Sequence, residues 1–445
     1  MSHYKPYPVY RDSGVEWIGQ VPEHWKVGSV KYWYQARLGK MIQPESKSDE
    51  DVLVPYHRAQ TVQWEQVVHE QVESMWASPQ EIETYLLIDG DLLICEGGDV
   101  CRAAIFKNDG NGKVIFQNSI HRVRPLGGNQ PEWLLHLMKI VRSSGWIDVL
   151  CSKNTIVHFT SEKLASLECT QPPISEQLEI LANVHSENLR IDSLITKKTR
   201  FIELLKEKRQ ALITHAVTKG LDPNAQTKDS KIEWIGEVPA HWSVQPIKYL
   251  ASIGNGSTPS KENSEYWEHG TLPWLTSGCV NLEVVDSAEQ FVTDTALREC
   301  HLPIVSPPAV LVGITGQGKT RGMASMLLIE ATINQHIAFL KPTSENICIE
   351  YLRRFLDAAY AWLRFDSEGV GSTKGAITCE QLANTKIALP PLHEQESILD
   401  VIHKKAERLD LLVSKTQRSI DLLKERRAAF ITAAVTGQID LRESA

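Results

Sequence analysis

The strongest constraint on this chain is an internal repeat, because two copies of one sequence fold into two copies of one structure. Residues 12–25 read DSGVEWIGQVPEHW and residues 229–242 read DSKIEWIGEVPAHW; we call both WIG segments, and they agree at ten of fourteen positions. A second match joins PPISEQLEIL, starting at Pro172, to PPLHEQESIL, starting at Pro390. The offsets of 217 and 218 residues indicate a tandem duplication.

Between the repeated parts lie two inserts, residues 27–171 and 243–389, of similar length and divergent sequence. They keep a common pattern, since DLLICEGGD from Asp91 and AVLVGITGQ from Ala309 both carry an apolar run into a Gly-rich turn. Each insert mixes β-rich runs with helical stretches such as PEWLLHLMKIVRSSG and IEYLRRFLDAAYAWLRF. We expect two tandem, pseudo-symmetric α/β or α+β domains with different surfaces.

The repeated segments that follow the inserts have the apolar spacing of long helices. Apolar residues recur there three, seven or eleven positions apart: Leu178, Leu181, Val184, Ile191, Leu194, Leu205 and Leu212, then Leu399, Ile402, Leu409, Leu412, Leu423 and Phe430. A helix of roughly 60 Å cannot cover such a stripe by itself, and the equivalent helix is its simplest partner. Pseudo-two-fold symmetry makes that pair antiparallel. We expect a two-helix coiled coil that separates the two domains at opposite ends of a rod.

These patterns divide the chain into five parts. The expected boundaries are 1–171 for the first domain, 172–220 for the first long helix, 221–389 for the second domain, 390–437 for the second long helix and 438–445 for a tail.

Composition places the chain among globular proteins of two to four domains, with 445 residues, 42% hydrophobic and 23% charged. No apolar run reaches 18 residues and the first residues do not resemble a secretory signal, so we expect a cytoplasmic protein. The eight cysteines form no CxxC pair, which favours buried thiols over a zinc site.

The WIGxVPxHW motif, the paired PPxxEQ helix starts and the helix ends KEKRQALITHAVT and KERRAAFITAAVT resemble the specificity subunit of type I restriction-modification systems. The resemblance extends over essentially the whole chain. It implies that residues 27–171 and 243–389 are target recognition domains, each reading one half of a split, asymmetric DNA sequence. It also implies that the helices set the spacing and dock two modification subunits.

In that family the chemistry resides in other chains, which implies no catalytic residue and no cofactor here. S-adenosylmethionine would bind the modification subunits, which methylate adenine, and ATP and Mg would bind the restriction subunits. The Pro-Pro pairs of this chain, QPPI, SPPA and LPPL, also lack the [DN]PP[YFW] motif of an amino-methyltransferase. The expected partners are double-stranded DNA, two modification subunits and two restriction subunits, without a membrane.

Candidate DNA-binding residues cluster in the Gly-rich turns, in the strands beside them and before the last short helix of each insert. They are Arg102, Lys107, Asn118, Arg122, Lys153, Asn154 and Thr155 in the first insert, and Lys319, Arg321, Gln335, Ser372, Thr373 and Lys374 in the second. Lysine and arginine can take phosphates or guanine, and asparagine an adenine edge. Any one of them can equally be a solvated charge or a turn-stabilising polar group.

Two carboxylate–amide pairs stand in the first turn after each Pro-Pro: Glu176 with Gln177, and Glu394 with Gln395. A carboxylate there interacts favourably with the helix dipole. Docking of a modification subunit is the alternative, and the sequence does not separate the two interpretations.

Two rival functions remain. Residues 313–320, GITGQGKT, fit a P-loop in which Lys319 would hold a nucleotide and Thr320 a Mg²⁺ ion. The following RGMASMLLI, however, predicts a strand where a P-loop needs a helix. The second rival is a coiled-coil scaffold that binds only protein.

Overall fold

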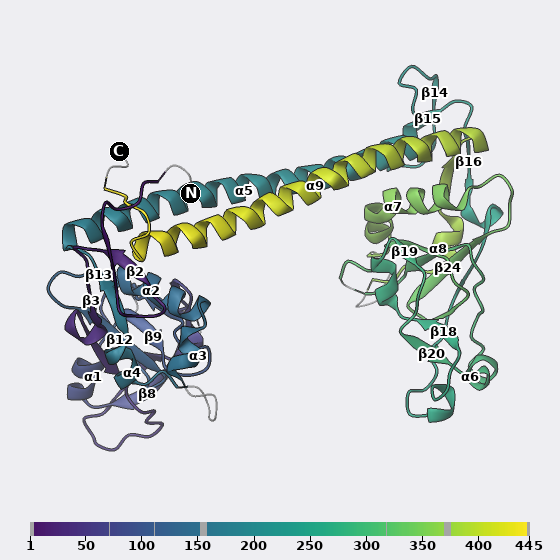
Figure 1. The fold of residues 1–445 in the computed structure, drawn as a ribbon. Helices are drawn as coiled ribbons and strands as arrows, with labels where there is room; N and C mark the ends of the chain where they lie inside the picture. Colours follow the sequence, from purple (N-terminus) through teal and green to yellow (C-terminus); the bar gives the residue numbers. More distant parts are fainter. Residues whose placement is uncertain are drawn as a thin grey trace. The chain divides into compact units, whose positions relative to one another are not determined.

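The computed structural model describes residues 4–70, 72–110, 112–151, 158–316, 318–368 and 375–442. The chain folds into two compact units (Figure 1). Unit 1 comprises residues 1–197 and 418–445, and unit 2 comprises residues 198–417. Two long helices, α5 (Ile174–Lys219) and α9 (Leu392–Val435), each contribute one part to each unit. Within the described ranges, no helix is long and apolar enough to cross a membrane.

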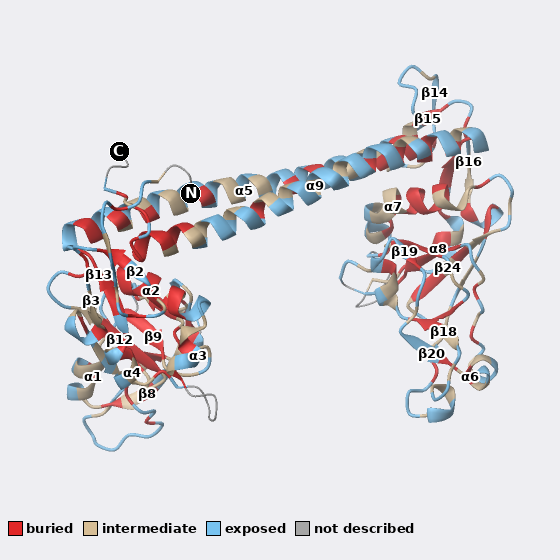
Figure 2. Cartoon of the chain, viewed as in Figure 1, coloured by how far each residue is buried: buried red, intermediate tan, exposed pale blue. Residues whose placement is uncertain are grey.

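Unit 1 is built on a four-stranded antiparallel sheet in the order β10-β9-β12-β4. The apolar run LLIC forms β9 (Leu92–Cys95), which is buried along its whole length. Its neighbours are β10 (Ala103–Ile105) and β12 (Ile120–Pro125), and β12 also pairs with β4 (Tyr34–Leu38). Helix α2 (Pro131–Ser143) covers this sheet with its apolar face, so the core of the unit lies between helix and sheet (Figure 2).

A second sheet of unit 1, in the order β11-β5-β8, joins a parallel pair to an antiparallel strand. Its strands are β11 (Ile115–Phe116), β5 (Val52–His57) and β8 (Glu73–Ala77). The other elements are short: β1 (Tyr10–Asp12), β2 (Gln20–Pro22), β3 (Lys26–Ser29), η1 (Val30–Tyr32), η2 (Ala59–Thr61), β6 (Val62–Gln63), β7 (Gln66–Val67), α1 (Pro79–Tyr85), α3 (Trp146–Leu150), α4 (Ser161–Ser166) and β13 (Glu168–Gln171).

Unit 2 has the main sheet β17-β24-β21-β22-β19 and the smaller sheet β20-β18-β23. The strands are β17 (Ala251–Asn255), β24 (Ile337–Pro342), β21 (Ala309–Gly313), β22 (Ala324–Leu327), β19 (Val284–Val285), β20 (Gln290–Val292), β18 (Leu272–Leu275) and β23 (Thr332–Ile333). The remaining elements are β14 (Thr227–Asp229), β15 (Glu237–Pro239), β16 (Ser243–Pro246), η3 (Ile247–Tyr249), η4 (Ser264–Tyr266), η5 (Ser277–Asn281), α6 (Asp294–Glu299), α7 (Ile349–Asp366), α8 (Cys379–Asn384) and β25 (Lys386–Leu389).

The two inserts share one fold despite their divergent sequences. Strands β4, β12, β9 and β10 of unit 1 correspond in order and pairing to β17, β24, β21 and β22 of unit 2. Each three-stranded sheet also has the same mixture of parallel and antiparallel pairs. The β-rich runs and both helical stretches expected from the sequence fold as expected, and each insert combines helices with mixed sheets.

Within each unit the parts of α5 and α9 lie side by side and run antiparallel. In unit 1, Asn183 Nδ2 donates to the Leu441 carbonyl just beyond α9, whereas Asp192, further along α5, pairs with Arg427. In unit 2, Arg209 pairs with Asp410, whereas Ile213 shares a core with residues near the start of α9. Two helical stripes therefore cover each other inside each unit.

The expected stripe needs a correction in its register. Leu178 is 49% exposed and Leu412 is 38% exposed, so neither belongs to the buried face. The buried face of α5 contains Val184 and Ile191, as expected, and also Ile180, and all three are almost inaccessible. Leu178 precedes Ile180 by two residues, which places it about 200° around the helix. Ile180 thus takes the place expected of Leu178, whereas Leu205, Leu399, Ile402 and Phe430 of the expected stripe are buried.

Candidate functional site

Each WIG segment is fastened to the start of a long helix by one glutamate. In unit 1, the carboxylate of Glu176 accepts hydrogen bonds from the Tyr7 hydroxyl at 2.7 Å and the Trp25 indole N–H at 2.9 Å. His24 Nε2 lies 2.7 Å from the other carboxylate oxygen. Burial, together with the Glu176 carboxylate, raises the pKa of Tyr7 well above its usual range, so Tyr7 remains a donor. The glutamate joins the first domain to α5.

Unit 2 repeats this join with the equivalent residues. The Trp242 indole N–H donates to Glu394 at 3.1 Å, and His241 Nε2 lies 2.8 Å from the same carboxylate. The His-Trp end of the WIG motif and the glutamate of PPxxEQ are therefore two parts of one contact. Their separation of about 150 residues hid this relation from the sequence.

The adjacent glutamines make a second join. Gln177 Oε1 accepts the backbone N–H of Gln130 at 2.7 Å, and Gln395 Oε1 accepts that of Cys348 at 2.8 Å. Gln130 and Cys348 are the N-cap residues of α2 and α7, where backbone N–H groups lack partners within the helix. Each glutamine thus positions the main helix of its insert against a long helix.

These contacts change the interpretation of the four expected docking residues. Glu176, Gln177 and Gln395 are buried, and Glu394 is only partly exposed, so their side chains join parts of this chain. A partner subunit cannot reach three of them in the folded chain. The residues that face a partner must therefore be sought elsewhere on the surface.

The predicted DNA-facing segments of unit 1 meet at one edge of its main sheet. The backbone N–H of Phe159 donates to the Glu96 carbonyl at 2.8 Å, which ties the Gly-rich turn after β9 to the segment before α4. His121, at the start of β12, lies 2.7 Å through Nε2 from the Phe159 carbonyl. Burial lowers the pKa of His121, so this histidine is neutral near pH 7.

Unit 2 brings together the equivalent segments. The Ile377 backbone N–H donates to the Ile314 carbonyl at 2.8 Å, and Thr315 Oγ1 lies 2.7 Å from His336 Nδ1. The turn after β21, the start of β24 and the segment before α8 are thus neighbours. Three stretches that are far apart in sequence form one edge in each unit, although their side chains differ between the units.

Three of the predicted DNA-binding arginines are already engaged within the chain. Arg122 is 7% exposed and donates to the Leu86 carbonyl at 2.8 Å, at the C-terminal end of α1. Arg102 donates to the Ala59 carbonyl at 2.7 Å, and Arg321, 4% exposed, pairs with Glu368 at 2.8 Å. Burial lowers the pKa of Arg122 to about 10, so it remains charged near pH 7. As folded, these three hold their own domains together.

Other candidates keep an accessible surface. Lys107, Lys319 and Gln335 are exposed, and Asn118 is half-buried with its side-chain oxygen bound by Gln117 Nε2 at 3.1 Å. The Gln335 amide oxygen accepts a hydrogen bond from Thr258 Oγ1. The other six candidates lie outside the described residues: Lys153, Asn154, Thr155, Ser372, Thr373 and Lys374. Lys107 and Lys319 are thus the accessible cations among the described candidates.

The P-loop-like stretch does not have the surroundings of a phosphate cradle. Strand β22 starts at Ala324, soon after Lys319 and Thr320, as the sequence predicts, whereas a P-loop continues into a helix. At Gly313 a Cβ atom would lie 2.3 Å from the Thr320 carbonyl oxygen, so this glycine permits the turn to fold back onto its own strand. Gln317, within the stretch, lies outside the described residues.

A surface feature that the sequence analysis missed occurs once in each unit. Tyr32 is 66% exposed and Tyr249 is 65% exposed, each at the end of its 3-10 helix. The ammonium of Lys31 lies 5.5 Å from the Tyr32 ring centroid, and that of Lys248 lies 5.6 Å from the Tyr249 centroid. We call these the Lys-Tyr patches. Both inserts keep a Lys-Tyr pair at the same position although their sequences diverge. This agreement was the sequence signal that could have revealed the patches.

The cysteines are free thiols that do not gather into a metal site in the described parts of the chain. In the parts of the chain that the structure describes, no three His, Cys, Asp or Glu side chains gather closely enough to hold a metal ion. All eight cysteines are free thiols, four of them buried and four half-buried. Burial raises the pKa of Cys101 and Cys169, which keeps these thiols protonated.

Comparison with known proteins identifies relatives of the whole chain. Residues 239–419 match the family described as the type I restriction modification DNA specificity domain. The putative type I restriction enzyme MjaX specificity subunit of Methanocaldococcus jannaschii is 23% identical over 436 residues, which cover 96% of each chain. The EcoR124I/EcoR124II specificity subunit of Escherichia coli is 24% identical over 199 residues; that match covers 44% of this chain and spans about half, 46%, of that subunit.

Solved structures with the same fold belong to the same group. A chain from a structure concerned with complex assembly of the type I R-M system matches with a TM-score of 0.66 and 17% identity, over 94% of this chain and 99% of that one. The HsdS subunit from Thermoanaerobacter tengcongensis matches with a TM-score of 0.53 and 17% identity, over 94% and 98%. The sequence motifs, the family match over residues 239–419 and the fold agree: the chain is similar to the specificity subunits of type I restriction-modification systems.

Proposed function

We propose that each unit reads one half of a split DNA target and that the two halves differ. The observation that carries this proposal is the repeated edge made by the Gly-rich turn, the start of β12 or β24, and the segment before α4 or α8. The backbone of this edge is the same in both units, but its side chains are different. One scaffold with two sets of side chains suits recognition of two different base sequences.

The charge of the inserts supports a role inside a larger complex. Residues 27–171 contain 14 Lys and Arg against 18 Asp and Glu, and residues 243–389 contain 11 against 15. Each insert is therefore at −4, whereas phosphate contacts dominate DNA affinity. Under this proposal the chain alone binds DNA weakly, and two modification subunits supply basic surface, S-adenosylmethionine and adenine methylation. Restriction subunits would supply the ATP- and Mg-dependent cleavage.

Two identical modification subunits need two copies of one docking surface, one copy in each unit. The Lys-Tyr patches meet this requirement, because the same two residues are exposed in both units. Leu204 and Leu422 meet it as well, since they are equivalent in the repeat and are 46% and 56% exposed on the long helices. We assign docking to these residues in place of the buried glutamate–glutamine pairs.

Mapping of modified adenines in host DNA tests the proposal. With the chain present, methylation should fall within one motif of two different half-sequences separated by a fixed gap. Deletion of this chain, with the modification subunits retained, should abolish that pattern. Methylation that persists unchanged after deletion would contradict the proposal.

The two rival functions give different results in simpler assays. A nucleotide hydrolase would bind ATP as a purified chain and lose that binding in Lys319→Ala, whereas we expect no ATP binding to lose. A protein-only scaffold would assemble with modification subunits without changing which DNA they methylate.

A further inference from the structure

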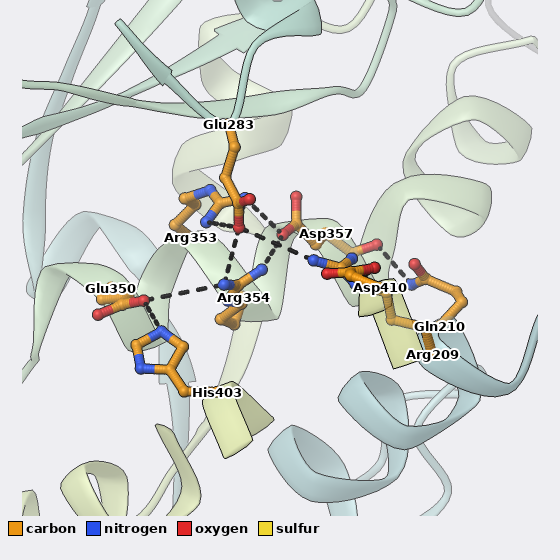
Figure 3. Close-up of polar contacts among 9 residues, drawn as sticks. All are labelled: Arg209, Gln210, Glu283, Glu350, Arg353, Arg354, Asp357, His403 and Asp410. Atoms are coloured by element: carbon orange, nitrogen blue, oxygen red, sulfur yellow. Dashed lines mark hydrogen bonds and ion pairs between the residues drawn. The ribbon is translucent and has the colours of Figure 1, made fainter. Parts of the chain in front are cut away.

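A network of ion pairs in unit 2 connects the insert to the two long helices (Figure 3). At its centre is Glu283, between η5 and β19. Its Oε1 lies 3.1 Å from Arg353 Nη1 and 2.8 Å from Arg354 Nη2. Both arginines belong to α7 and are buried, at 7% and 4% side-chain exposure. Burial raises the pKa of Glu283, but the two arginines outweigh this effect and hold it below its usual range.

The network continues from the insert onto both long helices. Arg209 of α5 approaches Glu283 Oε1 to 3.9 Å and Asp410 of α9 to 3.4 Å. Two further contacts lie beside it: Gln210 Nε2 donates to the Asp357 carbonyl at 3.1 Å, and His403 Nε2 lies 2.6 Å from Glu350. One carboxylate of the insert thus meets an arginine that bridges to the opposite helix.

Unit 1 contains the same three charges at repeat-equivalent positions. Glu65, Arg427 and Asp192 each lie 218 positions from Glu283, Arg209 and Asp410, respectively. Arg427 Nη1 lies 2.7 Å from Asp192, and Glu65 forms an ion pair with Lys139 of α2. Burial opposes ionisation of Glu65, but Lys139, with a smaller effect of Arg427, lowers its pKa. In unit 1, then, Glu65 pairs with α2 and Arg427 of α9 pairs with Asp192 of α5.

Retention of this glutamate is unexpected, because its surroundings have changed between the inserts. Arg353, Arg354 and Asp357 of α7 are replaced by Leu135, His136 and Lys139 in α2. Burial lowers the pKa of His136 to about 4, so the cation beside Glu65 is Lys139.

The backbone conformation of Glu65 also indicates that this glutamate has been retained. Glu65 adopts φ 64° in the turn of a two-strand hairpin, a conformation that favours glycine or asparagine. The glutamate has been kept although its neighbours differ and its backbone position favours other residues.

We propose that these two sets of charges are orienting clamps that fix the angle of each recognition domain on the long helices. The clamp of unit 2 is Glu283, Arg209 and Asp410, joined by ion pairs, and Glu65, Arg427 and Asp192 occupy the equivalent positions in unit 1. This inference rests on the proposed function, because a fixed angle matters only if two half-sites are read at a fixed gap. The six residues are positioning residues: they determine which spacing of the half-sites is accepted and do not contact DNA.

The positions of these contacts explain how the clamp would limit rotation of a recognition domain on the long helices. The joins made by Glu176 and Glu394 lie at the start of each long helix and hold one point of each domain. A clamp further along the helices adds a second point, and two separated points of attachment restrict the domain to rotation about the line that joins them. In unit 2, removal of the Glu283 charge would also take from two buried guanidinium groups the nearer of the two carboxylates that they share, the other being Asp357.

The test is methylation of DNA by the full chain assembled with its modification subunits. DNA duplexes carry the two half-sites at the native gap, or with one base pair added or removed, and the measured quantity is the ratio of methylation at altered and native gaps. We expect Glu283→Gln, Arg209→Ala and Glu65→Gln each to raise this ratio about fivefold, which corresponds to about 1 kcal/mol. The ratio compares two DNAs with one preparation, so partial unfolding cancels.

Arg200→Ala is the matched control, because Arg200 lies on the same helix as Arg209 but pairs only with exposed residues of that helix among its described ion pairs. It should leave the ratio unchanged. Asp410→Asn, at a position with 58% side-chain exposure, removes one clamp charge at little risk to folding and should raise the ratio like Glu283→Gln.

The double variant Glu283→Gln/Arg209→Ala should raise the ratio no further than the larger single change, since both residues act in one clamp. Ratios for the clamp variants equal to that of Arg200→Ala would overturn the clamp and leave the proposed function intact. A wild-type complex that methylates all gaps equally would instead contradict the proposed function.

Discussion

Arginine and lysine behave differently in these two domains. Arg122 reaches across from β12 to the last carbonyls of α1, where a cation is favourable and the carbonyls lack helical partners. Arg321 is held by Glu368. Lys107 and Lys319 stand exposed near the same edges. Under the proposed function, the arginines hold the edge of each domain together and the exposed lysines contact phosphate.

Substitution of the two lysines should separate these roles. We expect Lys107→Ala and Lys319→Ala each to weaken DNA binding by the assembled complex about equally for all sequences and to reduce the slope of log K against log salt by about 1. Titration of labelled DNA at several salt concentrations measures both quantities. Thermal unfolding should be unchanged.

Arg122→Ala is the contrasting variant, since it should lower the unfolding temperature by leaving the α1 carbonyls without their donor. If Arg122→Ala instead left stability intact and reduced the salt slope, Arg122 would be a phosphate contact after all.

The clamp also predicts a pH dependence of stability. The pKa of Glu283 is lowered in the folded chain, so its charge stabilises the fold above the ordinary glutamate value of about 4.3, and this contribution disappears as pH falls through the lowered value. The stability difference between wild type and Glu283→Gln should therefore be largest near pH 7 and shrink below about pH 4. Denaturant unfolding across that range measures it. A difference that grows on acidification would contradict the assigned charge state.

At the scale of elements, periodicity and the repeat predicted more than single residues did. The run LLIC becomes the buried strand β9 because four apolar residues between turns can be covered on both faces. The helices α2 and α7 follow from their apolar spacing. The prediction that Leu178 is buried was wrong because a stripe of leucines does not reveal which face of the helix is covered. The contacts of Arg122 and Glu176 could not be predicted because their partners lie 36 or more residues away, and no local pattern encodes that distance.

The glutamine joins between elements should contribute measurably to stability. Gln177→Ala and Gln395→Ala each leave the N-cap N–H group of α2 or α7 without its acceptor, and we expect a loss of about 1–3 kcal/mol in free energy of unfolding. Denaturant unfolding of the full chain measures this. Gln210→Ala, at an exposed position of α5, is the control and should cost less. Equal losses in free energy of unfolding for all three variants would contradict a special contribution of the two buried glutamines to stability.

The Lys-Tyr patches predict the stoichiometry of assembly. If each patch contacts one modification subunit, the double variant Lys31→Ala/Tyr32→Ala should yield complexes with a single modification subunit, and Lys248→Ala/Tyr249→Ala should do the same from the other unit. Native mass spectrometry counts the subunits. Full assembly with weakened DNA binding would instead identify the patches as phosphate contacts, and unchanged assembly and binding would remove them from both surfaces.

For the whole molecule, the duplication explains which features agree between the units and which differ. The joins, the clamps and the Lys-Tyr patches recur at equivalent positions, since each copy attaches its insert to the long helices in the same way. The side chains at the repeated edges differ between the units, which is what the proposed function expects. The sequence predicted this division because the repeat is visible without any structure.

Exchange of residues 27–171 for the equivalent insert of a related specificity subunit, followed by mapping of methylated adenines, tests the central claim most directly. The account predicts that one half of the methylated sequence changes to the donor's half while the other half and the gap remain. A hybrid that methylates an unchanged sequence, or one in which both halves change together, would contradict the assignment of one half-site to each unit.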